Sequence, residues 1–424
     1  MMSKMYKFAH LSDVHIGAFS NPKLKRLALD AFIKSIDACI ERGVDFIVIA
    51  GDLFDSNLPD MSIVNDAVKK MREVNERSIK IYTVYGSHDF SPNQSSMIDI
   101  LESAGLFKKV THGKMIDNKL YLEFQKDSKT GAKLVGISGM KQGIDRKYFE
   151  ELDRESLEKE EGFRVFIFHG ALSEYKSKDL SAMDSMALSN LPKGFDYYAG
   201  GHIHEHSHNN NISGFDNVVY PGALFGADYR DIEMSAKGLE RGFYLASFTE
   251  SIQKVEFVKI AACSYELVEY DVDGKSSMEA QADLQEIISR MEPEGKLVLI
   301  KVRGELTSGK TSDIEFSPFA RLLEAKGAIY VMMNYNQLTT KEYSSIKVVG
   351  ESVRDIESKI FKESIGNLKV TSPALKGDSG VSLSANLLDR IKQEKKSNES
   401  KVDYEKRMAE TGIEILGIQE AMEE

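Results

Sequence analysis

The sequence has no tryptophan and only two cysteines, Cys39 and Cys263, which lie far apart and form no CxxC pair. This pattern favours two free thiols in a reducing compartment over a disulfide or a cysteine metal site. The chain also has no apolar run of about 18 residues or more and no apolar signal-peptide segment near its N-terminus. These absences predict a protein that is neither secreted nor embedded in a membrane, and therefore a cytoplasmic one.

Basic residues are also few relative to acidic ones. The 55 lysines and arginines are outnumbered by 66 aspartates and glutamates, which gives a net charge of −11. Proteins that bind nucleic acids usually carry a basic surface, so this balance argues against strong, non-specific DNA binding by the chain alone. Aspartates that bind divalent cations would account for part of the acidic excess.

The length of 424 residues allows two or three domains of about 100–200 residues each. Residues 1–260 alternate strand-like and helix-like segments, among them an amphipathic helix that opens at Asn21-Pro22 and closes at Gly43. This alternation predicts an α/β sandwich. The predicted strands are rich in Val, Ile and Phe, as is typical of strands buried on both faces, and cover Lys7–Ser12, Asp45–Ala50, Ile79–Tyr85, Leu134–Ser138, Phe163–Phe168 and Asp196–Ala199.

The last 164 residues differ in pattern from the first 260. Residues 261–345 predict a smaller α+β domain, with strands at Tyr265–Asp273, Lys296–Arg303 and Ala328–Asn334 and helices at Met278–Met291 and Pro318–Lys326. Residues 346–424 predict a charged helical tail, with a helix at Ser352–Ile365, a linker at Pro373–Gly380 and two further short helices with apolar stripes. Two such helices bury little by themselves, so they either fold back on the preceding domain or dock into a partner's groove.

Five short motifs follow the predicted strands of the first 260 residues. They are Asp13-Val14-His15, Gly51-Asp52, Gly86-Ser87-His88-Asp89, His169-Gly170 and Gly201-His202-Ile203-His204. In open α/β sheets, sites form at the carboxyl ends of the strands, so these residues are expected to converge on one place.

The residue types indicate a metal site. Carboxylate and imidazole together suit Mn, Fe or Zn, and in Asp-x-His and His-x-His the two side chains point the same way from an extended backbone. Asp52 has two oxygens and can bridge two cations. Two cations about 3.5–4 Å apart can clamp a phosphate for in-line displacement, which predicts a two-metal phosphoesterase.

Each element also has an ordinary structural interpretation. A single histidine at a strand end is usually a surface or core residue, and Asp52 could merely cap a helix. We interpret His10 as structural, on the other face of its strand, and His206 and His208 as solvated loop residues. What favours a metal site is that all five motifs occur in order, each after a predicted strand.

The segments LSDVHIG, AGDLFD, GSHD, FHG and GGHIH together resemble the calcineurin-like metallophosphoesterase superfamily. That resemblance implies a four-layer β-sandwich flanked by helices. The C-terminal extension and the segment Tyr220-Pro221-Gly222-Ala223 are similar to SbcD-like, meiotic-recombination-type nucleases of DNA double-strand-break repair. The protein-phosphatase branch is less similar, since its Asp-Arg-Gly motif is absent after Asp52.

The resemblance implies a role for each motif residue. His88 would act at the scissile phosphate, and Asp89 would orient His88. Two divalent cations, most consistent with Mn²⁺, would be bound, the first by Asp13, His15, Asp52 and His204 and the second by Asp52, Ser87, His169 and His202.

Two positions depart from the family pattern. Ser87 stands where the superfamily normally has an asparagine that supplies an amide oxygen to the second cation, and a neutral hydroxyl is a poorer ligand. Asp55 stands where some relatives carry a histidine near the phosphate, and an ionised carboxylate cannot make the same contact with an anion. Both departures bear on catalytic rate rather than on fold.

The resemblance also implies partners: DNA, a coiled-coil, SbcC-like ABC-type ATPase that binds the C-terminal helices, and a second copy of the chain bound through helices near residues 60–105. The implied activity is exonuclease on duplex DNA and endonuclease on single strands, with the protein in the cytoplasm or on the nucleoid.

Two alternatives remain open. One is a phosphodiesterase or phosphatase for a small substrate such as a nucleotide, and the other is a weakly active structural adaptor of the ATPase.

Overall fold

The computed structural model describes residues 4–90, 96–140, 145–176, 183–210, 212–341, 353–367, 375–393, 395–396, 399 and 401–416. The chain forms two compact units. The first holds Met1–Glu269, Arg290–Lys301 and Phe316–Asn334, and the second holds Tyr270–Ser289, Val302–Glu315 and Tyr335–Glu424. In the described part of the chain, no helix combines the length and hydropathy of a membrane-spanning segment.

Two six-stranded sheets form the centre of the first unit. One sheet has the order β14-β13-β1-β2-β3-β4 and consists of β1 (Tyr6–Leu11), β2 (Phe46–Ala50), β3 (Lys80–Val84), β4 (Lys108–Lys109), β13 (Gly242–Phe248) and β14 (Ile252–Lys259). The other has the order β11-β12-β10-β9-β8-β7 and consists of β7 (Gln125–Lys126), β8 (Lys133–Ile137), β9 (Arg164–His169), β10 (Tyr197–Gly201), β11 (Ser207–Asn209) and β12 (Val218–Tyr220).

The inner strands of each sheet run parallel, and antiparallel strands close the edges. β1, β2, β3 and β4 are parallel to one another, as are β8, β9, β10 and β12. β13 and β14 pair antiparallel at one edge of the first sheet, and β7 and β11 do so at the two edges of the second. The parallel strands therefore bring their carboxyl ends to one side of each sheet.

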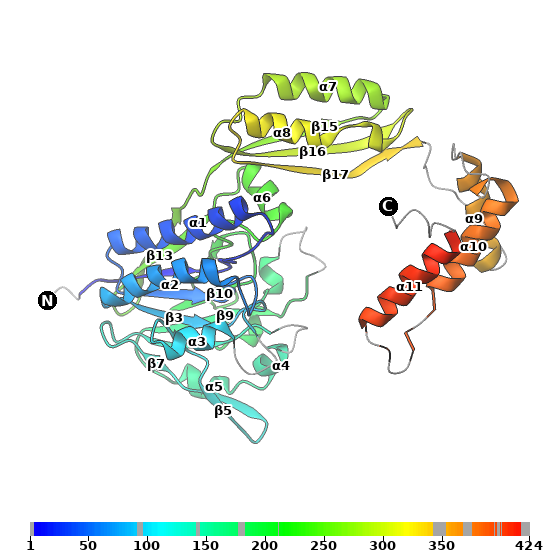
Figure 1. Ribbon diagram of the computed structural model, residues 1–424. Coiled ribbons are helices and arrows are strands. Elements are labelled where there is room, and N and C mark those ends of the chain that lie inside the picture. Colours follow the sequence, from blue (N-terminus) through cyan, green and yellow to red (C-terminus); the bar gives the residue numbers. More distant parts are fainter. Residues whose placement is uncertain are drawn as a thin grey trace. The chain divides into compact units, whose positions relative to one another are not determined.

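Both faces of each sheet are covered, which makes four layers. In β2, Ile47 and Ile49 belong to the core under helices α1 (Pro22–Glu41), α2 (Met61–Glu76) and α3 (Met97–Ser103), while Val48 belongs to the core between the sheets. Neighbouring side chains alternate because successive residues of a strand point to opposite faces. Figure 1 shows α1 and α2 along the outer face of the first sheet. The predicted α/β sandwich is confirmed.

Aromatic rings pack between the two sheets. The fully buried Phe8 ring of β1 lies 5.0 Å from the ring of Phe46 and 5.0 Å from that of Tyr197, which belongs to the opposite sheet. Each such ring removes a large apolar area from water, and the edge-to-face contact adds to that. This core fixes the ends of β1 and β2 against the ends of β9 and β10.

Shorter elements complete the sandwich. A separate hairpin pairs β5 (Gly113–Ile116) with β6 (Lys119–Leu122). The helices α4 (Asp145–Glu150), α5 (Arg154–Glu158) and α6 (Tyr229–Ala236) and the 3₁₀ turns Ser173–Tyr175 and Leu188–Asn190 fill the remaining connections. Residues of α4, α5 and these turns form the outer core of the second sheet.

The smaller α+β part has the predicted element order. It consists of β15 (Ser264–Asp271), α7 (Ser277–Arg290), β16 (Lys296–Leu306), the 3₁₀ turn Thr311–Asp313, α8 (Phe316–Ala325) and β17 (Tyr330–Thr340), with sheet order β15-β16-β17. The two compact units divide this sheet, so the domain boundaries at residues 260 and 345 stay predictions.

The tail forms three helices, α9 (Val353–Asn367), α10 (Gly377–Ile391) and α11 (Lys401–Leu416). α10 packs against both α9 and α11, as Figure 1 shows. Helix α10 begins at Gly377, inside the predicted linker Pro373–Gly380, so the linker is shorter than predicted at that end. The predicted apolar position Met422 lies outside the described residues.

Candidate metal centre

The five motifs meet at the carboxyl ends of strands from both sheets. Asp13 and His15 follow β1 and Asp52 follows β2, while Ser87 and His88 follow β3. From the second sheet, His169 is the last residue of β9, and His202 and His204 follow β10. Three overlapping groups of ligand atoms result, each within 4.8 Å: Asp13, His15 and His204; His15, Asp52 and His88; and Asp52, His169 and His202.

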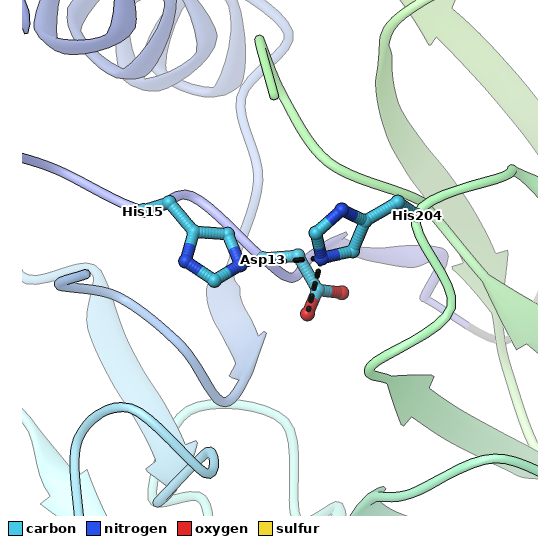
Figure 2. A group of neighbouring side chains, drawn as sticks. All are labelled: Asp13, His15 and His204. Carbon is cyan, nitrogen blue, oxygen red and sulfur yellow. Dashed lines mark hydrogen bonds and ion pairs between the residues drawn. The ribbon is translucent and has the colours of Figure 1, made fainter. Parts of the chain in front are cut away.

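The first group has two imidazoles that face each other. The Nε2 atoms of His15 and His204 are 3.2 Å apart, and the His204 Nε2 lies 3.9 Å from Oδ1 of Asp13. Figure 2 shows the two rings turned toward each other with the Asp13 carboxylate beside them. Two imidazole lone pairs directed at one point repel each other unless a positive charge lies between them, so this arrangement fits a bound cation.

The second group considered consists of Asp52, His169 and His202, and it contains a buried nitrogen that faces a carboxylate without a well-formed hydrogen bond. His169 Nδ1 lies 2.9 Å from the carbonyl oxygen of Ala50, which can only accept, so this nitrogen carries the proton. Its Nε2 is buried, has no hydrogen-bond partner among the described residues, and lies 3.2 Å from Asp52 Oδ2. A buried nitrogen without a partner is costly, and a cation beside Asp52 would satisfy it.

Asp52 lies between the two groups. Its Oδ2 is 3.8 Å from His15 Nε2, and its Oδ1 accepts a hydrogen bond of 2.8 Å from the backbone N–H of His88. Burial by itself would raise the pKa of Asp52, but the facing imidazoles of His169 and His15 hold that pKa well below its usual range. The carboxylate therefore stays ionised and can serve both cations.

The negative charge of the site also acts on the histidines. Burial opposes charging His15 and His169, yet the neighbouring carboxylates, Asp55 and Asp52 above all, raise the pKa of His15 to about 9 and that of His169 to about 10. His15 and His169 therefore retain their protons, because the carboxylates around them carry an excess of negative charge. Divalent cations would supply the same positive charge and displace those protons, as metal binding to imidazole requires.

Backbone strain is concentrated at the ligands. Asp13, His15 and Asp52 have φ of 48°, 48° and 49°, and His202 has φ of 91°. Such conformations cost non-glycine residues of order 1–3 kcal/mol each and persist only where the surroundings impose them. Here the N–H of His15 donates to the Asp52 carbonyl at 3.0 Å, and that of His202 donates to the Asp13 carboxylate at 3.0 Å. The strained backbone therefore holds the ligands in place.

Ser87 lies beside the second group. Its hydroxyl donates over 3.4 Å to Oδ2 of Asp52, the oxygen that also faces His169. Its direct ligation of a cation stays a prediction. The hydroxyl is in the right place for contact with a cation either directly or through a water molecule.

Asp89 differs from its expected role. It makes no hydrogen bond to the His88 ring among the described contacts. Its buried carboxylate instead accepts from the backbone N–H groups of Leu53, Phe54 and Gly86, at 3.0–3.3 Å. Burial and the charge of Asp52 raise the pKa of Asp89 to about 7. Asp89 therefore joins the loops after β2 and β3 rather than orienting His88.

Asp55 has the contacts that Asp89 was expected to make. Its carbonyl oxygen lies 2.8 Å from His88 Nδ1, and its carboxylate lies 3.1 Å from His15 Nδ1. Both rings thus carry their proton on Nδ1 and present Nε2 to the site. The residue noted as a departure from relatives therefore orients two histidines.

Two further residues were not predicted from sequence. Asp231 of α6 lies 2.8 Å from His204 Nδ1, and burial of its carboxylate is outweighed by this hydrogen bond and by Arg241, which hold the pKa of Asp231 well below its usual range. Buried Arg241 donates to the carbonyl oxygens of His204 and Asp231, at 2.6 and 2.7 Å. Neither residue belongs to a strand-end motif, and Asp231 follows His204 by 27 positions.

Other histidines have structural surroundings. His10 is buried, with Nδ1 3.0 Å from the hydroxyl of Tyr197, in agreement with a structural role. The interpretation of His208 as a loop residue was wrong, whereas His206 is a loop residue as predicted but is partly buried. The His206 ring stacks on Phe257 at 4.1 Å, and His208 lies in β11 with its ring 5.9 Å from that of Tyr244.

The centre opens into a cleft of about 240 Å³. His88 is on its wall with 43% of its side chain exposed, which leaves it accessible to a substrate. Arg230 of α6 is exposed on the same cleft. The lining also includes Asp52, Ser87, His202, His204, Glu205, Asp228 and Met234.

Gly86 is a site where a side chain would disrupt the centre. A Cβ there would lie 2.0 Å from Oδ1 of Asp52 and 2.2 Å from its backbone nitrogen. We expect Gly86→Ala to lower the Mn²⁺ retained after gel filtration at least several-fold, measured by plasma mass spectrometry. The control Gly412→Ala adds a Cβ with no atom within 4 Å and should retain as much Mn²⁺ as the unaltered chain. Full Mn²⁺ content in Gly86→Ala would contradict the bridging position of Asp52.

Known proteins are similar in sequence to this chain. Residues 6–206 match the family model described as calcineurin-like phosphoesterase. A DNA double-strand break repair protein Mre11 from Archaeoglobus fulgidus is 26% identical over 84% of this chain and 80% of its own length. An Mre11 protein from Methanococcus maripaludis is 26% identical over 59% of this chain and 66% of its own length.

Among solved structures, a dimetal phosphatase from Danio rerio is 12% identical and covers 60% of this chain and 99% of its own, with a TM-score of 0.37, too low to bear on the fold. The family match spans all five motifs, and its residues lie at the meeting point of the two sheets. Residues 6–206 thus resemble the calcineurin-like phosphoesterases, and the chain is a metal-dependent phosphoesterase.

Proposed function

We propose that this protein is a DNA nuclease of double-strand-break repair that uses two divalent cations, Mn²⁺ by preference, to hydrolyse phosphodiesters. The carrying observation is the set of three overlapping ligand groups, two of which contain Asp52, at the exposed His88. The relatives named Mre11 support DNA as the substrate. The proposed activities are exonuclease on duplex DNA and endonuclease on single strands, in the cytoplasm or on the nucleoid.

The proposed ligand sets follow the two strand-end groups. Asp13, His15, Asp52 and His204 would hold one cation, and Asp52, Ser87, His169 and His202 the other. When bound, the cations would neutralise the phosphate and activate the attacking water. The chain itself positions the proton donor: the Nδ1–H of His88 donates to the Asp55 carbonyl at 2.8 Å and leaves Nε2 available. In the doubly protonated ring, the Nε2–H would give its proton to the leaving oxygen, and the neutral ring with its proton on Nδ1 would remain.

Arg230 supports an anionic substrate. The chain carries a net charge of −11, and its exposed arginines are commonly paired, as Arg26 is with Asp30 at 2.9 Å. Arg230 lines the metal cleft and has no ion-pair partner among the described residues. We assign it to a phosphate next to the scissile one, since guanidinium groups match phosphate geometry.

The partners are also part of the proposal. We assign the helices α10 and α11 to a coiled-coil, SbcC-like ABC-type ATPase, which would supply much of the basic DNA surface that this acidic chain lacks. A homodimer through residues 60–105 is supported by exposed apolar side chains there: Met61 and Ile100 are 59% and 55% exposed. Residues 261–345 would contact DNA.

His88→Asn tests the nuclease. We expect it to lower the hydrolysis of linear duplex DNA by at least about 10²-fold, the contribution of a positioned acid or base. Its Mn²⁺ content should not change, because all the proposed ligands remain. The hydrolysis is measured by gel assay with Mn²⁺ and with Mg²⁺, and the Mn²⁺ content is measured by plasma mass spectrometry. The exposed His112, outside the cleft lining, provides the control variant His112→Asn, which should remain active.

The same assay includes single-stranded DNA and a nitrophenyl phosphodiester. Turnover of the small ester with DNA left intact would replace the nuclease by a small-substrate phosphodiesterase. Bound Mn²⁺ without hydrolysis of any substrate would indicate a structural adaptor. Equal activity of His88→Asn and the unaltered chain would contradict the role of His88.

Arg230→Gln tests the phosphate contact. We expect KM for duplex DNA to rise several-fold while kcat changes little, and the slope of log affinity against log salt to fall by about 1. Arg26→Gln removes an exposed arginine of α1 that is already ion-paired, and it should leave both quantities unchanged. An unchanged salt slope in Arg230→Gln would remove Arg230 from the substrate path.

Deletion of residues 381–424 tests the partner assignment. We expect the truncated chain to lose copurification with the coiled-coil ATPase, because most of α10 and all of α11 are removed. Its Mn²⁺ content should stay the same, since every proposed ligand precedes residue 205. Copurification of the truncated chain with the ATPase would show that another surface binds it.

A further inference from the structure

The two ligand groups differ in what lies behind their imidazoles. In the first group, each histidine has a carboxylate on its Nδ1: Asp55 at 3.1 Å from His15, and Asp231 at 2.8 Å from His204. In the second group, His169 Nδ1 has a backbone carbonyl at 2.9 Å, and the His202 ring has no hydrogen bond to any described residue.

We propose that Asp231 and Asp55 are positioning residues that make the site of Asp13, His15, Asp52 and His204 the tighter of the two cation sites. This inference rests on the ligand sets proposed above. A carboxylate on Nδ1 fixes the tautomer and the ring plane and makes the ligating Nε2 more basic. At His202, no carboxylate fixes the ring or raises the basicity of the ligating nitrogen to a comparable extent.

Asp231 is itself held rigidly. Its Oδ2 accepts a hydrogen bond of 2.8 Å from the N–H of Ala227, and its backbone N–H donates to the side chain of Asp228, which caps α6. A carboxylate in the first turn of a helix is also favoured by the helix dipole. Only 7% of Asp231 is exposed, so water competes little for its bond to His204.

Arg241 also forms hydrogen bonds with both His204 and Asp231. One of its nitrogens donates to the carbonyl of His204 at 2.6 Å, another donates to the carbonyl of Asp231 at 2.7 Å, and Nε donates to Ser235 at 2.8 Å. The guanidinium also lies 3.5 Å from the Asp231 carboxylate, which compensates its buried charge. His204 is therefore fixed at both its ring and its backbone, whereas His202 is fixed by its backbone alone.

The test is a Mn²⁺ titration of the full chain by calorimetry. We expect two unequal steps in the unaltered protein. Asp231→Asn and Asp55→Asn should each weaken the tighter step by about 10–100-fold and the other step by no more than a few-fold, as expected for loss of a carboxylate behind a ligating imidazole. Asp231→Glu should restore part of the affinity. Equal weakening of both steps, or of neither, would overturn the proposal.

Two controls separate positioning from folding and from the ligand sets. Glu233→Gln removes a carboxylate from the same helix that pairs with Lys237 and Lys301 and not with His204, and it should leave both steps unchanged. His204→Asn should abolish the tighter step and His202→Asn the weaker one; the reverse pattern would overturn the assignment of the tighter site.

A spectroscopic readout checks the geometry. With one equivalent of Co²⁺, the visible absorption spectrum should change in Asp231→Asn and stay the same in Glu233→Gln. An unchanged spectrum in Asp231→Asn would contradict a positioning role. Absence of any Mn²⁺ or Co²⁺ binding by the unaltered chain would instead refute the proposed metal centre itself.

Discussion

The charge of one buried carboxylate, that of Asp52, governs the arrangement of the whole centre. It lies where the ends of β2 and β9 meet, and it faces His15, His169 and the backbone of His88. A buried charge is tolerated only where it is paired. The imidazoles pair with that charge, and the strained conformations at Asp13 and His15 and the glycines that allow close approach lie around it.

The sequence predicted the elements whose pattern is set locally. Parallel strands such as β2 and β9 are buried on both faces, so their apolar runs are unmistakable, and the ligand motifs follow them directly. The edge strands β4, β7 and β11 were missed, because β4 and β7 have two residues each and β11 has three, too few to give a periodic signal. The longer strands β13 and β14 were missed as well.

The supporting residues of the site were missed for a related reason. Asp231 and Arg241 meet His204 only because α6 and β13 fold back over the end of β10, and a single aspartate or arginine in a polar segment has no distinctive spacing. Asp55 was noticed, but only as a deviation, since its contacts with His15 and His88 follow from loop geometry. The sequence placed the candidate ligands at strand ends that the structure brings together, but it did not identify the residues behind them. The sequence around Asp231 does contain one recognisable pattern, a helix N-cap, because Asp228 caps α6 three positions before Asp231.

The separation of the ligands along the chain has a consequence for folding. Asp13 and His204, which meet at one point, are separated by 191 positions and belong to different sheets. Contacts between such distant segments form late, after the loop-closure entropy has been overcome. A cation that needs both sheets cannot nucleate either of them. A cation held by residues of both sheets would therefore be captured only once the two sheets have come together.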